Sequence, residues 1–175
     1  MKIAVIVLAG VAVVAAVAAG IFAGPYFTDD PDSGAASATA PCGDRSYGHI
    51  SSLKRTGDGF RMRFDPAWFT SGVTANVAAA EDGVVEPGEP VPNDNYVVDE
   101  GHRLLTYLVP ADAHVTVLTR QGDPANFGAT PITVDELSRL VAGDKPVDLF
   151  EPLDTGVWIG VKVDTVCSID QQYRP

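Results

Sequence analysis

Apolar and polar side chains alternate along residues 156–169 (GVWIGVKVDTVCSI), near the carboxyl end of the chain. The odd positions are mostly aliphatic, whereas glycine, lysine, aspartate and serine occupy most even positions. Because successive side chains of a strand point to opposite faces, this alternation predicts a strand with one buried face. At roughly 3.4 Å per residue the strand would exceed about 40 Å. A strand of that length usually bends or bulges, and it pairs with several neighbours in a barrel or rolled sheet.

Two further pairs of strands are expected before this one. Residues 47–54 favour a strand, residues 57–59 (GDG) a turn, and residues 60–64 (FRMRF) a returning strand. In that hairpin the aromatic side chains and Met62 point inward and the arginines face water. Residues 103–109 and 114–119 have the spacing of a second hairpin.

Two short helices complete the expected elements. Residues 71–80 favour a helix that ends at Asp82 and Gly83. Thr133 and Glu136 form a capping box that opens a helix over residues 134–142. Residues 81–100 contain seven acids, three prolines and no base, which predicts a long exposed loop. The predicted fold class is therefore mainly β, a β-rich α+β domain built as a small antiparallel barrel or roll. An OB-like (oligonucleotide/oligosaccharide-binding) barrel with two short helices is the architecture we expect.

The first 27 residues predict an export segment. Residues 3–27 carry no charge, follow Lys2 and precede Asp29 and Asp30, and as a helix they would span a bilayer. The positive-inside tendency keeps the amino terminus cytoplasmic and places the remainder outside. A transmembrane anchor is favoured, and a cleaved signal peptide is the alternative, with secretion as its consequence. The predicted organisation is an anchor or signal peptide (1–27), a flexible acidic linker (28–41) and an extracytoplasmic β-rich domain (42–175).

The two cysteines lie at opposite ends of the expected domain. An exported domain with Cys42 at its start and Cys167 in its last strand suggests one disulfide. Two alternatives stay open: an inert buried Cys167 with a free Cys42, or Cys167 as a nucleophile.

The net negative charge of the chain limits the kinds of partner that we expect. The 175 residues include 23 acidic and 12 basic ones, a formal net charge of −11. Such a chain repels phosphate backbones, so we expect no nucleic acid partner. Residues 93–95 (NDN) resemble part of a calcium loop but lack its required glycine and glutamate, and they favour a simple turn. We predict no metal ion and no cofactor.

No catalytic motif of strong spacing is present. Residues 51–54 match S-x-x-K, but on an expected strand and without the partner motifs of that enzyme class. The three histidines are far apart in the sequence and show no metal-ligand spacing. Trp68, Phe69 and Trp158 are the candidate ligand face, as an exposed platform for sugar or peptide stacking, and core packing is their alternative role.

The sequence contains the run PNDNYVVDEGHRLLTYLVP, with GHISSL before it and WIGVKVDTV after it. These segments resemble a group of uncharacterised exported proteins of Gram-positive, actinomycete-like bacteria. In that group a P-N-D-x-Y segment precedes a pair of strands. The resemblance implies an exported small domain and no particular activity.

These observations lead to one main hypothesis and two alternatives. The main hypothesis is a membrane-tethered, non-enzymatic module of the cell envelope that binds a protein, peptide or glycan. The first alternative is an accessory cell-wall hydrolase or transpeptidase-type enzyme that uses carboxylates or Cys167. The second is a structural subunit of a membrane complex, which would expose a large apolar patch.

Overall fold

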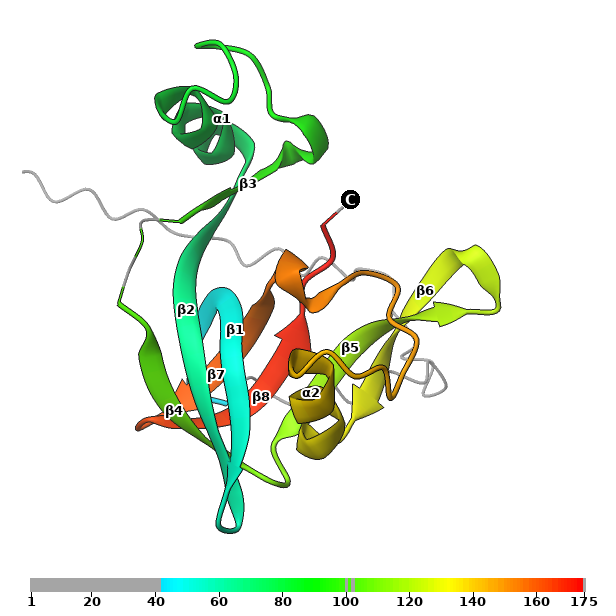
Figure 1. Ribbon diagram of the computed structural model, residues 1–175. Coiled ribbons are helices and arrows are strands. Elements are labelled where there is room, and N and C mark those ends of the chain that lie inside the picture. The colour runs from blue at the N-terminus through cyan, green and yellow to red at the C-terminus, as the bar shows by residue number, and fades with distance from the viewer. Residues whose placement is uncertain (1–41, 100, 102, 175) are drawn as a thin grey trace, which may run out of the picture. The chain divides into compact units, whose positions relative to one another are not determined.

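The computed structural model describes residues 42–99, 101 and 103–174. It confirms a mainly β domain with a closed five-stranded barrel and two α-helices (Figure 1). The strands are β1 (Asp44–Thr56), β2 (Gly59–Ser71), β3 (Asn95–Val98), β4 (Leu105–Pro110), β5 (His114–Gln121), β6 (Asp123–Ile132), β7 (Val157–Lys162) and β8 (Thr165–Gln171). The helices are α1 (Gly72–Glu81) and α2 (Val134–Val141), with 3-10 turns η1 (Pro92–Asp94) and η2 (Leu153–Thr155).

The barrel closes in the order β1-β2-β4-β8-β7. Antiparallel pairing joins β1 to β2, β2 to β4, β7 to β8 and β1 to β7. The ring is completed by a parallel contact of β4 with β8, at Leu108 opposite Thr165. This closed Greek-key order is that of an OB-like barrel, so the predicted architecture is confirmed.

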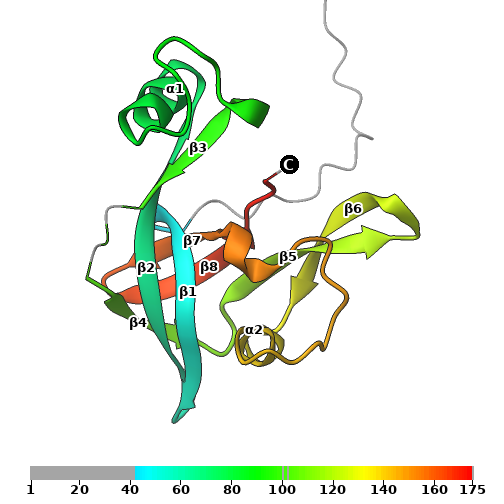
Figure 2. The same ribbon diagram turned by 45° about the horizontal axis from the view of Figure 1, so that its top comes forward.

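The predicted hairpin of residues 103–109 and 114–119 is wrong. β4 and β5 do not pair with each other, because both run parallel to β8 along the same edge of that strand. The hairpin partner of β5 is β6, which extends beyond the barrel (Figure 2). β6 does not look like a strand in the sequence, because it contains Pro124, Gly128 and Pro131. Proline is tolerated there because β6 pairs on one side only, so a missing amide donor interrupts no second ladder.

The single long strand predicted for residues 156–169 is also wrong, because the segment is a hairpin of β7 and β8. Val163 and Asp164 turn the chain with φ angles of 48° and 60°. Two consecutive positive φ angles are typical of a type I′ turn, which normally contains Asn-Gly or Asp-Gly. The alternation therefore correctly indicates strands with one buried face, but the turn lacks the residues that would reveal it.

Replacing Val163 with asparagine is expected to stabilise the protein by about 1 kcal/mol, because a β-branched residue is strained at positive φ. The side chain of Val163 is 88% exposed, so the substitution removes little packing. Urea unfolding of Val163→Asn against the wild type measures the gain. The matched control is Val73→Asn, at a 79% exposed valine in α1. An equal gain in that control would contradict the turn-strain explanation.

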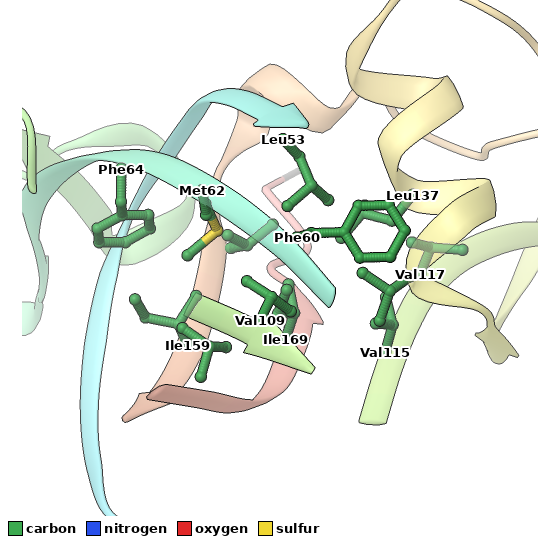
Figure 3. Packing of buried hydrophobic residues seen from close by; sticks show 13 residues of the cluster. Leu53, Phe60, Met62, Phe64, Val109, Val115, Val117, Leu137, Ile159 and Ile169 are labelled. Atoms are coloured by element: carbon green, nitrogen blue, oxygen red, sulfur yellow. The ribbon is translucent and has the colours of Figure 1, made fainter. Parts of the chain in front are cut away.

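The core fills the barrel with aliphatic and aromatic side chains (Figure 3). Phe60, Met62 and Phe64 of β2 are buried while Arg61 and Arg63 are exposed, as the first hairpin predicts. α2 packs Leu137 into this core, beside Leu53 and Phe60. Its predicted capping box is confirmed: Glu136 N donates to Thr133 Oγ1, and Thr133 N donates to the Glu136 carboxylate at 2.8 Å.

A small lobe projects from the barrel, formed by α1, β3 and the loop between them (Figures 1 and 2). The predicted helix is present as Gly72–Glu81, with Asp82 as its C-cap and Gly83 after it. The purely exposed loop predicted for residues 81–100 needs correction, because β3 pairs with β2 and Val91 is buried against Ala75 and Ala79. Because residues 81–100 are rich in acidic residues and proline, their sequence pattern does not reveal these few apolar contacts.

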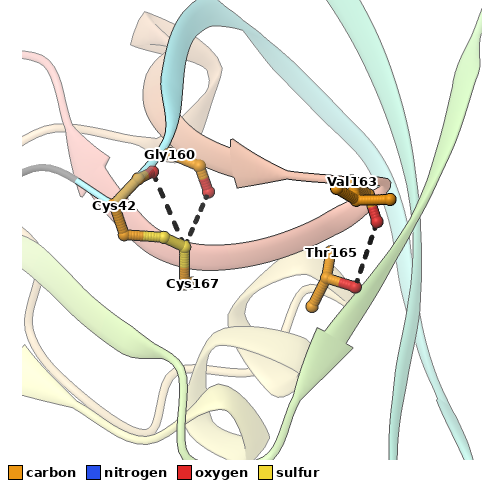
Figure 4. The surroundings of a disulfide bond; sticks show 5 residues. All are labelled: Cys42, Gly160, Val163, Thr165 and Cys167. Atoms are coloured by element: carbon orange, nitrogen blue, oxygen red, sulfur yellow. Dashed lines mark hydrogen bonds between the residues drawn. A yellow bond between two sulfur atoms is a disulfide. The ribbon is translucent and has the colours of Figure 1, made fainter.

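The disulfide between Cys42 and Cys167 is present, with a Cα–Cα distance of 6.1 Å (Figure 4). It joins Cys42, two residues before the start of β1, to β8, beside the carbonyl oxygen of Gly160. The predicted anchor and linker, residues 1–27 and 28–41, lie outside the described residues. Among the residues that are described, no helix has the length and apolar character needed to cross a bilayer.

Candidate functional site

Aromatic side chains from three strands meet on the outer surface of the barrel. Tyr47 of β1 lies opposite Trp158 of β7 in the strand register, and their ring centroids are 5.3 Å apart. Phe69 of β2 lies 5.2 Å from Tyr47 and 6.1 Å from Trp158. The pairing of β1 with β2 ends at Tyr47 and Ala67, beyond which β2 continues alongside β3. The cluster thus occupies the fork where β2 leaves β1.

This fork holds a pocket of about 390 Å³, which we call the aromatic pocket. It is lined by Arg45, Ser46, Tyr47, Pro66, Ala67, Trp68, Phe69 and Trp158. The three candidate residues from the sequence, Trp68, Phe69 and Trp158, therefore line one cavity. Trp68 is 61% exposed, whereas Phe69 and Trp158 are half-buried. None of the three belongs to the buried core, so the core alternative does not describe them.

Hydrogen bonds hold the rings of the aromatic pocket in place. The Tyr47 hydroxyl donates to the carbonyl oxygen of Thr155 at 2.6 Å. Trp158 Nε1 donates to Gln172 Oε1 at 2.7 Å. The guanidinium of Arg45 lies 5.0 Å from the Trp158 ring centroid, in cation–π geometry. The site therefore combines fixed aromatic walls with one exposed positive charge.

Sequence reasoning missed Tyr47 and Arg45, because their neighbours on β7 and β2 become known only with the strand register. The one available signal was the period-two pattern of residues 45, 47 and 49, which places their side chains on a single face of β1.

Comparison with models of protein families, with curated proteins and with solved structures finds no match.

Burial raises the pKa of the Tyr47 hydroxyl, and the charge and hydrogen bond of Arg174 partly oppose this shift. A folded-state pKa above the unfolded value means that Tyr47 contributes its stability fully below about pH 10. That contribution is lost as the pH rises through the folded-state pKa.

We therefore expect Tyr47→Phe to lose less stability than the wild type between pH 9 and pH 11 (roughly one unit either side of the tyrosine reference). At neutral pH the variant should be less stable by about 1 kcal/mol, because the bond to Thr155 is gone. Urea unfolding of both proteins across this range is the measurement. Tyr96 and Tyr107, whose pKa values are also raised, are common to both proteins and cancel in the comparison. Parallel pH profiles would contradict the assignment to Tyr47.

Asp65 and His49 lie opposite each other on the same face of the β1–β2 pair, next to the aromatic pocket. The Oδ1 atom of Asp65 is buried without a hydrogen-bond partner, and the His49 and Tyr47 ring centroids are 6.0 Å apart. Among the described residues, no three histidine, cysteine or acidic side chains are grouped so as to hold a metal ion.

A larger cavity of about 560 Å³ lies under the loop that follows α2, and it includes Arg120, Asp148 and Phe150. Arg120 already has partners there: its Nε atom lies 3.9 Å from Asp148 Oδ2, and its Cζ atom lies 5.4 Å from the Phe150 ring centroid. We place the candidate site in the aromatic pocket because the rings there come from three strands of the barrel. Cys167 is bonded to Cys42, so it is not available as a thiol nucleophile while the disulfide is intact.

Proposed function

We propose that this protein is a membrane-tethered, non-enzymatic binding module of the cell envelope, and that its aromatic pocket holds a segment of an envelope glycan. The tether is the uncharged segment of residues 3–27, and the resemblance to exported proteins of Gram-positive bacteria is in line with it. The observation that carries the proposal is the gathering of Trp68, Phe69 and Trp158 around one cavity.

Fold and charge together favour a glycan over other polymers. OB-like barrels bind oligonucleotides and oligosaccharides, and this analogy of architecture only narrows the choice. The net charge of −11 disfavours an oligonucleotide. Aromatic faces suit the apolar faces of sugar rings, and the exposed Arg45 provides hydrogen-bond donors at the rim for hydroxyl or carboxylate groups.

The test measures the binding of solubilised envelope glycan fragments to the full chain, with tryptophan fluorescence as the readout. Trp68→Ala should weaken binding about tenfold, in line with the loss of one stacking contact. Its effect on stability should be small because Trp68 is 61% exposed. Phe127→Ala, at a 37% exposed aromatic residue of β6, is the matched control and should leave binding unchanged. Binding of envelope peptides in place of glycans would mean that the ligand is a peptide and that the glycan assignment is wrong. Binding of neither would refute the proposed binding function.

A structural role in a membrane complex is the second candidate, and the small lobe favours it. Val73 and Val77 of α1 are 79% and 52% exposed, and they line a cavity of about 440 Å³. The acidic Glu81 lines the same cavity, so a partner would need apolar side chains and a basic one. Co-purification of a stoichiometric membrane partner that Val77→Asp abolishes would support this role, whereas purification of the chain alone would count against it.

A further inference from the structure

Basic side chains gather on one outer face of a barrel that is acidic overall. Lys54 of β1 lies opposite Arg61 of β2, and Arg61 lies opposite Leu108 of β4, so the three side chains form a row across the face. Arg63, two residues beyond Arg61, points to the same side. All four residues are exposed, and within the described part of the chain no ion pair engages the three basic ones.

Exposed aliphatic side chains adjoin this row. Leu108 is 55% exposed, and its amide donates to the carbonyl oxygen of Asp164 at 3.0 Å, which places it beside the β7–β8 turn. That turn presents Val163, 88% exposed, next to the exposed Lys162. We call this surface the basic-aliphatic face: Lys54, Arg61, Arg63, Leu108, Lys162 and Val163. Acidic residues near it include Asp58 and Asp164, in the two adjoining turns, and Asp44, which pairs with Val161.

The described chain begins at this same end of the barrel. Asp44 pairs with Val161, and the disulfide holds Cys42 beside Gly160, a few residues from Val163. Residues 28–41 separate Cys42 from the uncharged segment of residues 3–27. Even fully extended, these fourteen residues span at most about 50 Å. If residues 3–27 are in a bilayer, as the proposed function requires, this length is the limit on the distance between the lipid and Cys42 at the start of the described domain.

We infer that the basic-aliphatic face docks on the anionic lipid surface of the membrane in which the chain is anchored, an inference that rests on the proposed tether. Basic side chains are attracted to anionic headgroups, and exposed aliphatic side chains enter the headgroup boundary. A soluble polyanion would engage the charges but would leave Val163 and Leu108 in water. Lipid matches both parts of the surface. Docking orients the barrel, because the chain is otherwise acidic and the bilayer repels its other faces.

The experiment uses the full chain reconstituted in vesicles. Val163→Cys supplies the one free thiol, since Cys42 and Cys167 are bonded to each other. An environment-sensitive fluorophore on this thiol should be quenched by spin-labelled lipid in phosphatidylglycerol-containing vesicles, but not in pure phosphatidylcholine. Val84→Cys, at a 61% exposed position of the small lobe, should stay unquenched in both.

Charge reversal tests the face itself. Arg61→Glu/Arg63→Glu in the labelled chain should shift the docking equilibrium toward the free state at least about tenfold. Arg139→Glu/Lys145→Glu changes the net charge equally near α2 and should leave docking unchanged. A second variant, Val163→Asn with the label at Thr106→Cys beside Arg63, should dock more weakly although it folds more stably. That combination excludes misfolding as the cause.

Flotation with the vesicles tests the tether separately from the docking of the basic-aliphatic face. Failure of the full chain to float would refute the tether of the proposed function. Flotation without quenching at position 163 would leave the tether intact and refute docking. Quenching that is unchanged by Arg61→Glu/Arg63→Glu would also refute it. If inorganic polyphosphate changes the label's emission in neutral vesicles while spin-labelled lipid does not quench in anionic ones, the face binds a soluble polyanion and the membrane assignment is wrong.

Discussion

Reducing the Cys42–Cys167 disulfide is expected to lower the free energy of unfolding by about 3 kcal/mol, within the range typical of native disulfides. The two cysteines are 125 residues apart in sequence and enclose nearly all of the described fold. Breaking the bond therefore frees a long segment of the unfolded chain. In the folded state the bond holds Cys42, two residues before β1, to β8, and β1 pairs beside it with β7.

The measurement is urea unfolding of the wild type with and without reductant, beside the variant Cys42→Ser/Cys167→Ser. The reduced wild type and the variant should agree, and reductant should leave the variant unchanged. The first residues of β1 should fray in both, which moves Arg45 away from Trp158 and changes the tryptophan emission. A loss below about 0.5 kcal/mol would show that strand pairing alone fixes this end of the barrel.

The barrel itself could be predicted from the sequence because its evidence is local. The alternation of residues 60–64, the turn at Gly57 and the capping box at Thr133 each depend on neighbouring residues. The errors arose where a local signal was absent or misleading. Val163 and Asp164 make a turn without glycine or asparagine, and Pro131 lies within an edge strand. Pairing partners that depend on closure, such as β4 with β8, leave no local pattern.

The candidate site was predictable only in part, for a related reason. Trp68, Phe69 and Trp158 are conspicuous as aromatic residues, and the structure brings them to one cavity. Tyr47 forms the floor of the cluster, at 2% exposure, but in the sequence it looks like an ordinary strand residue. Only the strand register sets Tyr47 against Trp158 on one side and Ala67 on the other.

The aromatic pocket depends on the absence of a side chain at Gly156, and Gly156→Ala is expected to destabilise the protein by about 3 to 5 kcal/mol. The backbone of Gly156, with φ 100° and ψ 164°, lies in a region that is essentially restricted to glycine, and other residues cost about 1 to 3 kcal/mol there. A Cβ atom would also collide with the hydroxyl and ring of Tyr47. Displacing that ring breaks its bond to Thr155, worth about 1 kcal/mol, and forces a repacking that costs about as much again.

Gly57→Ala separates the collision from the backbone strain. Gly57 also has a positive φ, 57°, but apart from Gly57 itself and its two chain neighbours nothing lies within 4 Å of the position that its Cβ would take. This control should therefore lose only about 1 kcal/mol. Urea unfolding gives both values, and the near-ultraviolet circular dichroism of the aromatic residues should change in Gly156→Ala but not in Gly57→Ala. Equal losses of stability, with an aromatic signal that changes only in Gly156→Ala, would mean that Tyr47 moves aside at little energetic cost. The rings around Trp158 would then be adjustable walls, and a ligand would have to order them at a cost to its affinity.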